Sequence, residues 1–195
     1  QYRWISNSSS IGRDLKQYDT FKIGGGDEDP ITLLEPIGNV LMISNKNCMM
    51  TWNDYSLEGF DNGIGCCSSN GYVKRGDLYF LHYTGLYVTA GGSPKLLSRK
   101  IERYIKGATK AGLEAGAMGW KGLSIFCTIG DVTLYNDDGS LWKVLSDVCV
   151  EYATADQNWY IHTNVTATAF KTYIASDGSV KLTMNSISVG KNALY

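Results

Sequence analysis

The sequence predicts a mainly β protein: a sandwich or barrel-like body of short antiparallel strands with one helix near residues 94–111. Three observations favour this fold class. The chain has 195 residues, the length of one domain. It contains 22 glycines and 13 tyrosines but 3 prolines. Short apolar runs recur along it with turn residues between them. We expect residues 1–30 to form an N-terminal arm and residues 31–195 a single β-rich domain.

The first 30 residues differ in composition from the rest. Loop-forming runs such as Gly24–Gly26 and Asp27–Asp29 stand beside large aromatic residues, including Tyr2 and Trp4. Because large apolar side chains need cover, they either pack back on the body or dock on a neighbouring subunit. We expect an ordered arm in which Tyr2 and Trp4 serve as interface anchors.

From residue 31 onward, short runs rich in β-branched and aromatic residues indicate strands. The expected strands are, in chain order, 31–34, 40–43, 72–74, 78–81, 85–89, 123–129, 132–135, 141–145, 148–152, 159–162, 166–174 and 180–184. Asp138-Gly139 and Asp177-Gly178 each lie between two of these runs. Asp-Gly supplies the positive φ that tight turns need, so both pairs predict hairpins, and Asn70-Gly71 is a third candidate.

One helix is expected after Ser93-Pro94, a pair typical of a helix start. Leu97 and Ile101 then begin a helical spacing of apolar residues. Gly112 is the expected stop, because the following glycines at 116, 119 and 122 disfavour regular helix. We expect residues 112–122 to form a flexible or tightly turned segment that leads into the next strand.

The expected helix carries a basic face. Candidate contact residues on it are Arg99, Arg103, Lys106 and Lys110, and Trp120 follows in the glycine-rich segment. The face is either solvated or a contact for an acidic neighbouring subunit, nucleic acid or anionic lipid. The net charge of -1 excludes a globally basic nucleic-acid binder. Trp120 is either a core anchor or part of a membrane-active segment, although no apolar stretch is long enough to span a membrane.

The residues that usually carry catalysis or hold metals form no known motif. The two histidines, His82 and His162, have no H-x-x-x-H or CxxC partner, and phosphate-loop and serine-elbow motifs are absent from the sequence. The acidic pairs and runs could ligate calcium, but turn chemistry explains them equally well. The 5 cysteines are either reduced thiols or one or two bridges plus a free thiol. We therefore predict a non-enzyme without metal or cofactor.

Residues 75–88, RGDLYFLHYTGLYV, resemble the segment around the catalytic histidine of NlpC/P60 cysteine peptidases. The resemblance implies Cys66 or Cys67 as the nucleophile and His82 as the base. The chain departs from that family in two ways. Gly65 stands where the family has aspartate, and His82 follows Cys67 by 15 positions, a spacing too short for the intervening helix and strands.

As a whole, the chain resembles structural proteins of bacteriophages and other virions. The resemblance rests on the short strands, Asp-Gly hairpins, glycine-, asparagine- and tyrosine-rich turns, few prolines and unpaired cysteines. It implies a non-enzymatic subunit of a virion or extracellular appendage that forms homo-oligomers through the arm and the basic helix, together with other proteins of the assembly. A glycan- or receptor-binding β module that uses exposed aromatic residues is the alternative.

Overall fold

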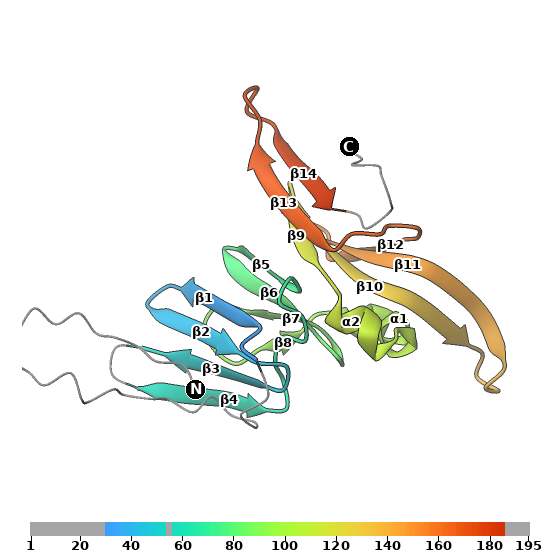
Figure 1. The fold of residues 1–195 in the computed structure, drawn as a ribbon, viewed down its shortest axis with the longest axis horizontal. Helices are drawn as coiled ribbons and strands as arrows, with labels where there is room; N and C mark the ends of the chain where they lie inside the picture. The colour runs from blue at the N-terminus through green and yellow to red at the C-terminus, as the bar shows by residue number, and fades with distance from the viewer. Residues whose placement is uncertain (1–29, 54–55, 186–195) are drawn as a thin grey trace, which may run out of the picture.

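The computed structural model describes residues 30–53 and 56–185. The predicted arm therefore lies outside the described residues except for Pro30, and Tyr2 and Trp4 lie outside them too. Within the described ranges the chain is mainly β, as the sequence predicts, and it is built from four antiparallel sheets. These sheets stay open rather than closing into a barrel, so the sandwich-like alternative is the one observed (Figure 1).

The sheets follow one another along the chain. The first contains β1 (Leu33–Ile37), β2 (Val40–Ser44), β3 (Cys48–Trp52) and β4 (Leu57–Asn62), in that order. The second contains β5 (Tyr72–Arg75), β6 (Asp77–His82), β7 (Gly85–Thr89) and β8 (Lys95–Leu96). The third has the order β12-β11-β10-β9, from β9 (Met118–Lys121), β10 (Ser124–Tyr135), β11 (Leu141–Ala153) and β12 (Asn158–His162). A separate hairpin pairs β13 (Ala169–Ile174) with β14 (Val180–Asn185). The sequence analysis did not predict β3, β4, β8 and β9 as strands.

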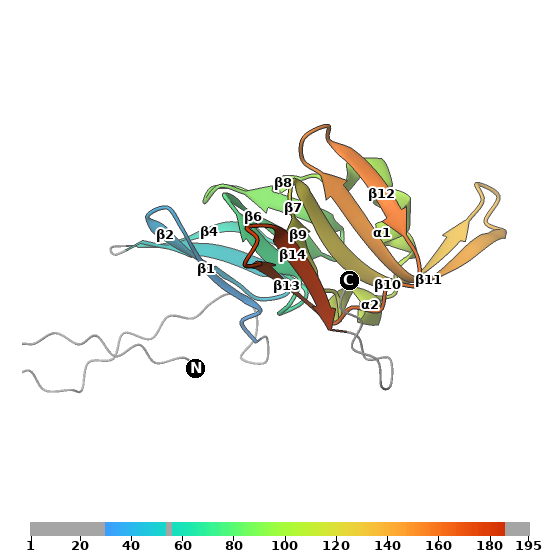
Figure 2. The same cartoon turned by 90° about the horizontal axis from the view of Figure 1, so that it is seen from above.

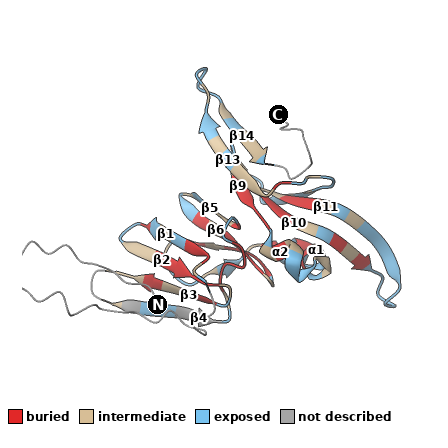
Figure 3. Cartoon of the chain, viewed as in Figure 1, coloured by how far each residue is buried: buried red, intermediate tan, exposed pale blue. Residues whose placement is uncertain are grey.

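The second sheet is the middle layer of the body. Leu78 and Phe80 of β6 belong to a core shared with Met42 and other residues of the first sheet. Leu81 belongs to a second core shared with Ile125 and other residues of the third sheet. Successive side chains of a strand point to opposite faces, so a strand buried on both faces reads as a continuous apolar run, here LYFL. Figure 2 shows the sheets turned by 90° from the view of Figure 1, and Figure 3 shows buried segments where the sheets meet.

Helical structure occurs near the predicted region with different bounds. Lys95 and Leu96 form β8 instead of a first helical turn, and the 3₁₀ helix η1 (Ser98–Ile101) continues into α1 (Glu102–Gly107). The helix then breaks at Ala108, which makes a β-bridge to Val132. A further short helix, α2 (Lys110–Glu114), follows it. None of these described helices has the length and apolar character needed to cross a membrane.

Gly112, the predicted stop, lies inside α2 rather than after a helix. It is there because α2 lies close to β10: a Cβ atom at this position would stand 2.7 Å from the carbonyl oxygen of Ile129 and 3.3 Å from the Cα of Gly130. Thr109 begins the helix by accepting a hydrogen bond from the Gly112 backbone N–H at 3.0 Å. The predicted turned segment 112–122 is instead the end of α2 followed by β9.

Both predicted Asp-Gly hairpins are confirmed. Gly139, between β10 and β11, has φ +82°, and Gly178, between β13 and β14, has φ +78°. Asn70-Gly71 forms a turn before β5 and does not join two strands. The four expected strands between 123 and 152 are two long ones, because β10 and β11 continue through irregularities at Gly130 and Asp147, both of which have positive φ.

Candidate functional site

The predicted basic residues of the helical region have different surroundings. Lys106 Nζ lies 2.6 Å from Glu102, and Lys110 Nζ lies 4.0 Å from Glu114. Arg103 instead lies over the ring of Trp142 on β11, with its guanidinium carbon 4.4 Å from the ring centre. Arg99 is exposed, and no ion pair of this residue occurs in the described ranges. The structure therefore brings two of the four against aromatic side chains distant in the sequence: Arg103 lies over Trp142, and Lys110 Nζ lies 5.5 Å from the ring centre of Tyr83.

Trp120 lies on β9, half-buried against the core between the second and third sheets. The guanidinium carbon of Arg75 stands 5.4 Å from its ring centre. Its backbone carbonyl accepts a hydrogen bond of 2.5 Å from the hydroxyl of Thr172 on β13. Trp120 thus helps to hold the β13–β14 hairpin on the third sheet.

A hollow lies between α1 and the end of the β10–β11 hairpin. It has a volume of about 470 Å³, and we call it the hairpin pocket. The residues that line it are Arg103, Tyr135, Asn136, Asp137 and Trp142. Tyr135 is 60% exposed and Trp142 is 51% exposed. Figure 1 shows this hairpin projecting from the body beside α1. The pocket combines two aromatic rings with a guanidinium, an amide and a carboxylate.

A β-bulge places Trp142 in the pocket. Leu134 is paired with Lys143 and Tyr135 with Leu141, so Trp142 has no partner across the ladder. A bulged residue leaves the regular alternation of the strand, and its side chain can be turned to a new direction. Here the indole lies against Arg103 of α1. The sequence analysis named Arg103 but did not join it to the other four residues. The sequence signal that could have joined them is the Asp138-Gly139 turn, which has an aromatic residue on each side, Tyr135 and Trp142.

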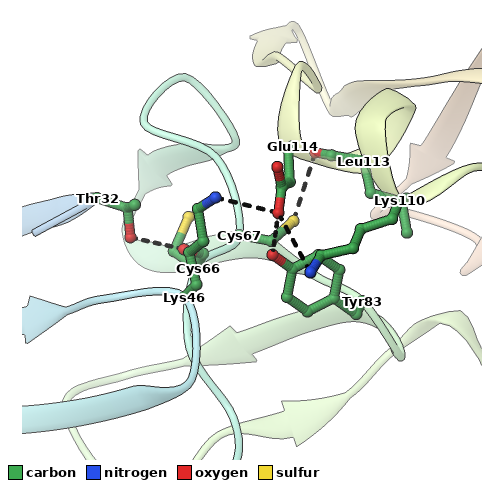
Figure 4. A network of polar contacts seen from close by, with 8 residues as sticks. All are labelled: Thr32, Lys46, Cys66, Cys67, Tyr83, Lys110, Leu113 and Glu114. Carbon is green, nitrogen blue, oxygen red and sulfur yellow. Dashed lines mark hydrogen bonds and ion pairs between the residues drawn. The ribbon is translucent and has the colours of Figure 1, made fainter. Parts of the chain in front are cut away.

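A second polar cluster joins the first two sheets to α2 (Figure 4). The Tyr83 hydroxyl donates to Glu114 Oε1 at 2.5 Å, and Lys46 Nζ lies 3.0 Å from the same oxygen. These hydrogen bonds, with that of Tyr83 first, lower the pKa of Glu114 below its ordinary value. Each partner comes from a different part of the chain, so the cluster is a joint between layers.

The cysteines named by the NlpC/P60 resemblance are next to this joint. Cys66 Sγ donates to the Ser68 carbonyl at 3.0 Å, and Cys67 Sγ donates to the Leu113 carbonyl at 3.4 Å. Burial raises the pKa of Cys66 to about 12 and also raises that of Cys67. Because the thiolate is the reactive form, this environment opposes a nucleophilic role. His82 Nδ1 lies 2.8 Å from the Thr84 hydroxyl.

All five cysteines are free and buried. Over residues 30–53 and 56–185, histidine, cysteine, aspartate and glutamate form no group of three or more that could hold a metal ion. Of the acidic groups considered for calcium, Asp27–Asp29 lie outside the described residues. Asp138 accepts hydrogen bonds from the Ser140 hydroxyl and N–H, which lower its pKa and explain its place in the turn.

Comparison with known proteins gives no family for the chain: it matches no family model and no curated protein.

Proposed function

We propose that the protein is a non-enzymatic structural subunit of a virion or extracellular appendage, and that it assembles with copies of itself. The observation that supports this most is the position of its exposed apolar side chains. Ten large hydrophobic residues of the described chain are exposed, and six of them lie on the two projecting hairpins: Tyr135, Leu141, Trp142, Val144, Tyr173 and Ile174.

The β10–β11 and β13–β14 hairpins project from the stacked sheets in different directions (Figure 1). Val144 is 56% exposed and Ile174 is 74% exposed. Four of the six, Tyr135, Leu141, Trp142 and Val144, lie on the one β10–β11 hairpin, and exposed apolar side chains that gather on one part of a surface favour contact with another protein. Tyrosine, tryptophan and arginine are also the residues enriched in the buried centres of such contacts, and Arg103 and Trp142 already lie together here.

The predicted N-terminal arm is the other contact in this proposal. It supplies Tyr2 and Trp4 as anchors, while Arg99 and Arg103 supply charge for an acidic neighbour. The buried, hydrogen-bonded thiols support a role without nucleophilic chemistry, since each sulfur of Cys66 and Cys67 donates to a backbone carbonyl.

Light scattering after size exclusion tests the proposal. We expect the full chain to have a mass that is a multiple of 21.4 kDa. Deletion of residues 1–25, the double change Leu141→Ser with Val144→Ser, and the charge reversal Arg99→Glu with Arg103→Glu should each reduce that mass. Leu34→Ser is the matched control, because Leu34 is 49% exposed on β1, away from both hairpins. A monomeric full chain would contradict the proposal.

A further inference from the structure

The two projecting hairpins have the same turn. In β10–β11 the Asn136 N–H donates to the Ser140 carbonyl at 2.8 Å and the Gly139 N–H to the Asn136 carbonyl at 2.9 Å. In β13–β14 the corresponding bonds join Ala175, Gly178 and Ser179 at the same two distances. Asp138 and Asp177 each accept from the N–H of the serine two residues later at 2.8 Å. The backbone and the Asp-Gly-Ser sequence therefore suffice for this turn.

The first two positions of the turn differ between the hairpins. They are Asn136 and Asp137 in β10–β11, and Ala175 and Ser176 in β13–β14. Since the second hairpin forms the turn with alanine and serine, the amide of Asn136 and the carboxylate of Asp137 are not required for it. One N–H of the Asn136 side-chain amide donates a hydrogen bond to the Ser140 hydroxyl at 2.9 Å. In the described structure the side-chain oxygen of Asn136, Oδ1, and the Asp137 carboxylate accept no hydrogen bond.

Asn136 and Asp137 line the pocket together with Arg103 and Tyr135. Arg103 makes no ion pair within the described ranges, and its guanidinium lies over Trp142. Tyr135, which lines the same hollow, is 60% exposed. The hairpin pocket thus has hydrogen-bonding groups beyond those that the turn requires, together with two aromatic residues.

The mixture of groups identifies the class of ligand. A guanidinium and a carboxylate line the pocket together, so its charges balance and it favours neither an anionic nor a cationic ligand. A pyranose ring has apolar C–H faces that stack on aromatic rings, and its hydroxyls both donate and accept hydrogen bonds. The volume of about 470 Å³ lies within the range of small-molecule sites. We propose that the hairpin pocket binds a neutral saccharide, with Trp142 and Tyr135 as stacking surfaces and Asn136, Asp137 and Arg103 as hydroxyl partners.

Nuclear magnetic resonance of the ¹⁵N-labelled full chain tests this site. The indole N–H signal of Trp142 is assigned as the one that Trp142→Phe removes. The probes are three neutral disaccharides, cellobiose, lactose and N,N′-diacetylchitobiose, with glucuronic acid and glucosamine as charged comparisons. We expect at least one neutral disaccharide to shift the Trp142 signal in a saturable way, and neither charged sugar to bind more tightly.

The second hairpin supplies the matched variant. Asn136→Ala with Asp137→Ser gives the first turn the residues of the second, so the fold should be unchanged by circular dichroism while affinity falls about tenfold or more. The converse change, Ala175→Asn with Ser176→Asp, should leave the Trp142 shift as it is. The proposal is overturned if no neutral disaccharide moves the signal, if the Asn136→Ala, Asp137→Ser variant binds as tightly as the wild type, or if a charged sugar binds more tightly.

Discussion

Replacing Gly112 by alanine should destabilise the protein, although the same change stabilises most helices. In an unhindered helix, Gly→Ala gains about 0.8–1.0 kcal/mol from helix propensity. At Gly112 the new Cβ would stand 2.7 Å from the Ile129 carbonyl oxygen and 3.3 Å from the Gly130 Cα. Both are backbone atoms, so no side-chain rotation relieves the contact, and α2 must move away from β10. Overpacking of this kind typically costs about 1–3 kcal/mol.

The difference between this cost and the propensity gain leaves an expected fall in the free energy of unfolding of up to about 2 kcal/mol, and a fall in Tm of up to roughly 8 °C for a chain of this size. Urea denaturation followed by tryptophan fluorescence measures the first quantity, and calorimetry the second. Gly92→Ala is the matched control: no heavy atom lies within 4 Å of its ideal Cβ, so this change should stabilise by about 0.4–1 kcal/mol. A Gly112→Ala protein as stable as the Gly92→Ala protein would refute the close approach of α2 and β10.

Three further predictions follow from burial and charge. Phe80→Ala removes a fully buried ring from the core between the first two sheets, and urea denaturation should show a loss of about 3–5 kcal/mol, whereas an effect near zero would contradict the layer arrangement. Glu114→Gln should cost up to about 1 kcal/mol at neutral pH, because the contacts with Tyr83 and Lys46 lower the folded pKa of Glu114. The stability difference between the wild type and Glu114→Gln should be complete above pH 4.5, the ordinary pKa of a glutamate, and should vanish as the pH falls through the lower pKa of Glu114 in the folded protein. A stability difference that persists at still lower pH would contradict the role given to the Glu114 carboxylate. The five buried thiols should react with Ellman's reagent only after unfolding, and one fast thiol in the native protein would instead favour the cysteine-peptidase interpretation.

The hairpins could be predicted because their signal is local. Asp138-Gly139 and Asp177-Gly178 fix positive φ within the turn itself, whatever packs around them. The interruptions at Gly130 and Asp147 have the same local chemistry, so the sequence pattern also predicted strand ends there. In the structure β10 and β11 pair on both sides of those residues, and this pairing across the sheet keeps each strand continuous.

The helix bounds and the pocket depend on contacts between distant segments. Apolar spacing predicted a helix through Ala108, but Ala108 bridges Val132, a contact that no local pattern contains. Likewise, the charge of Arg103 was visible in the sequence, whereas its partner was not. Trp142 meets it because the bulge after Leu134 shifts the register of β11, and a register shift is a property of the pair of strands.

On the β10–β11 hairpin, Val144 belongs to the assembly proposal alone, whereas Arg103 and Trp142 serve both proposals. Val132 and Leu134 are buried in the core that also contains Ile105 of α1, so they mark the side that faces the helix. Val144 pairs with Thr133, which alternates with them, and therefore points away from α1. Arg103 and Trp142 of the pocket meet on the helix side. A neighbour seated on Val144 would leave these two residues accessible, so Val144→Ser should lower the mass without weakening saccharide binding. The exchange of Asn136→Ala with Asp137→Ser should weaken saccharide binding without lowering the mass.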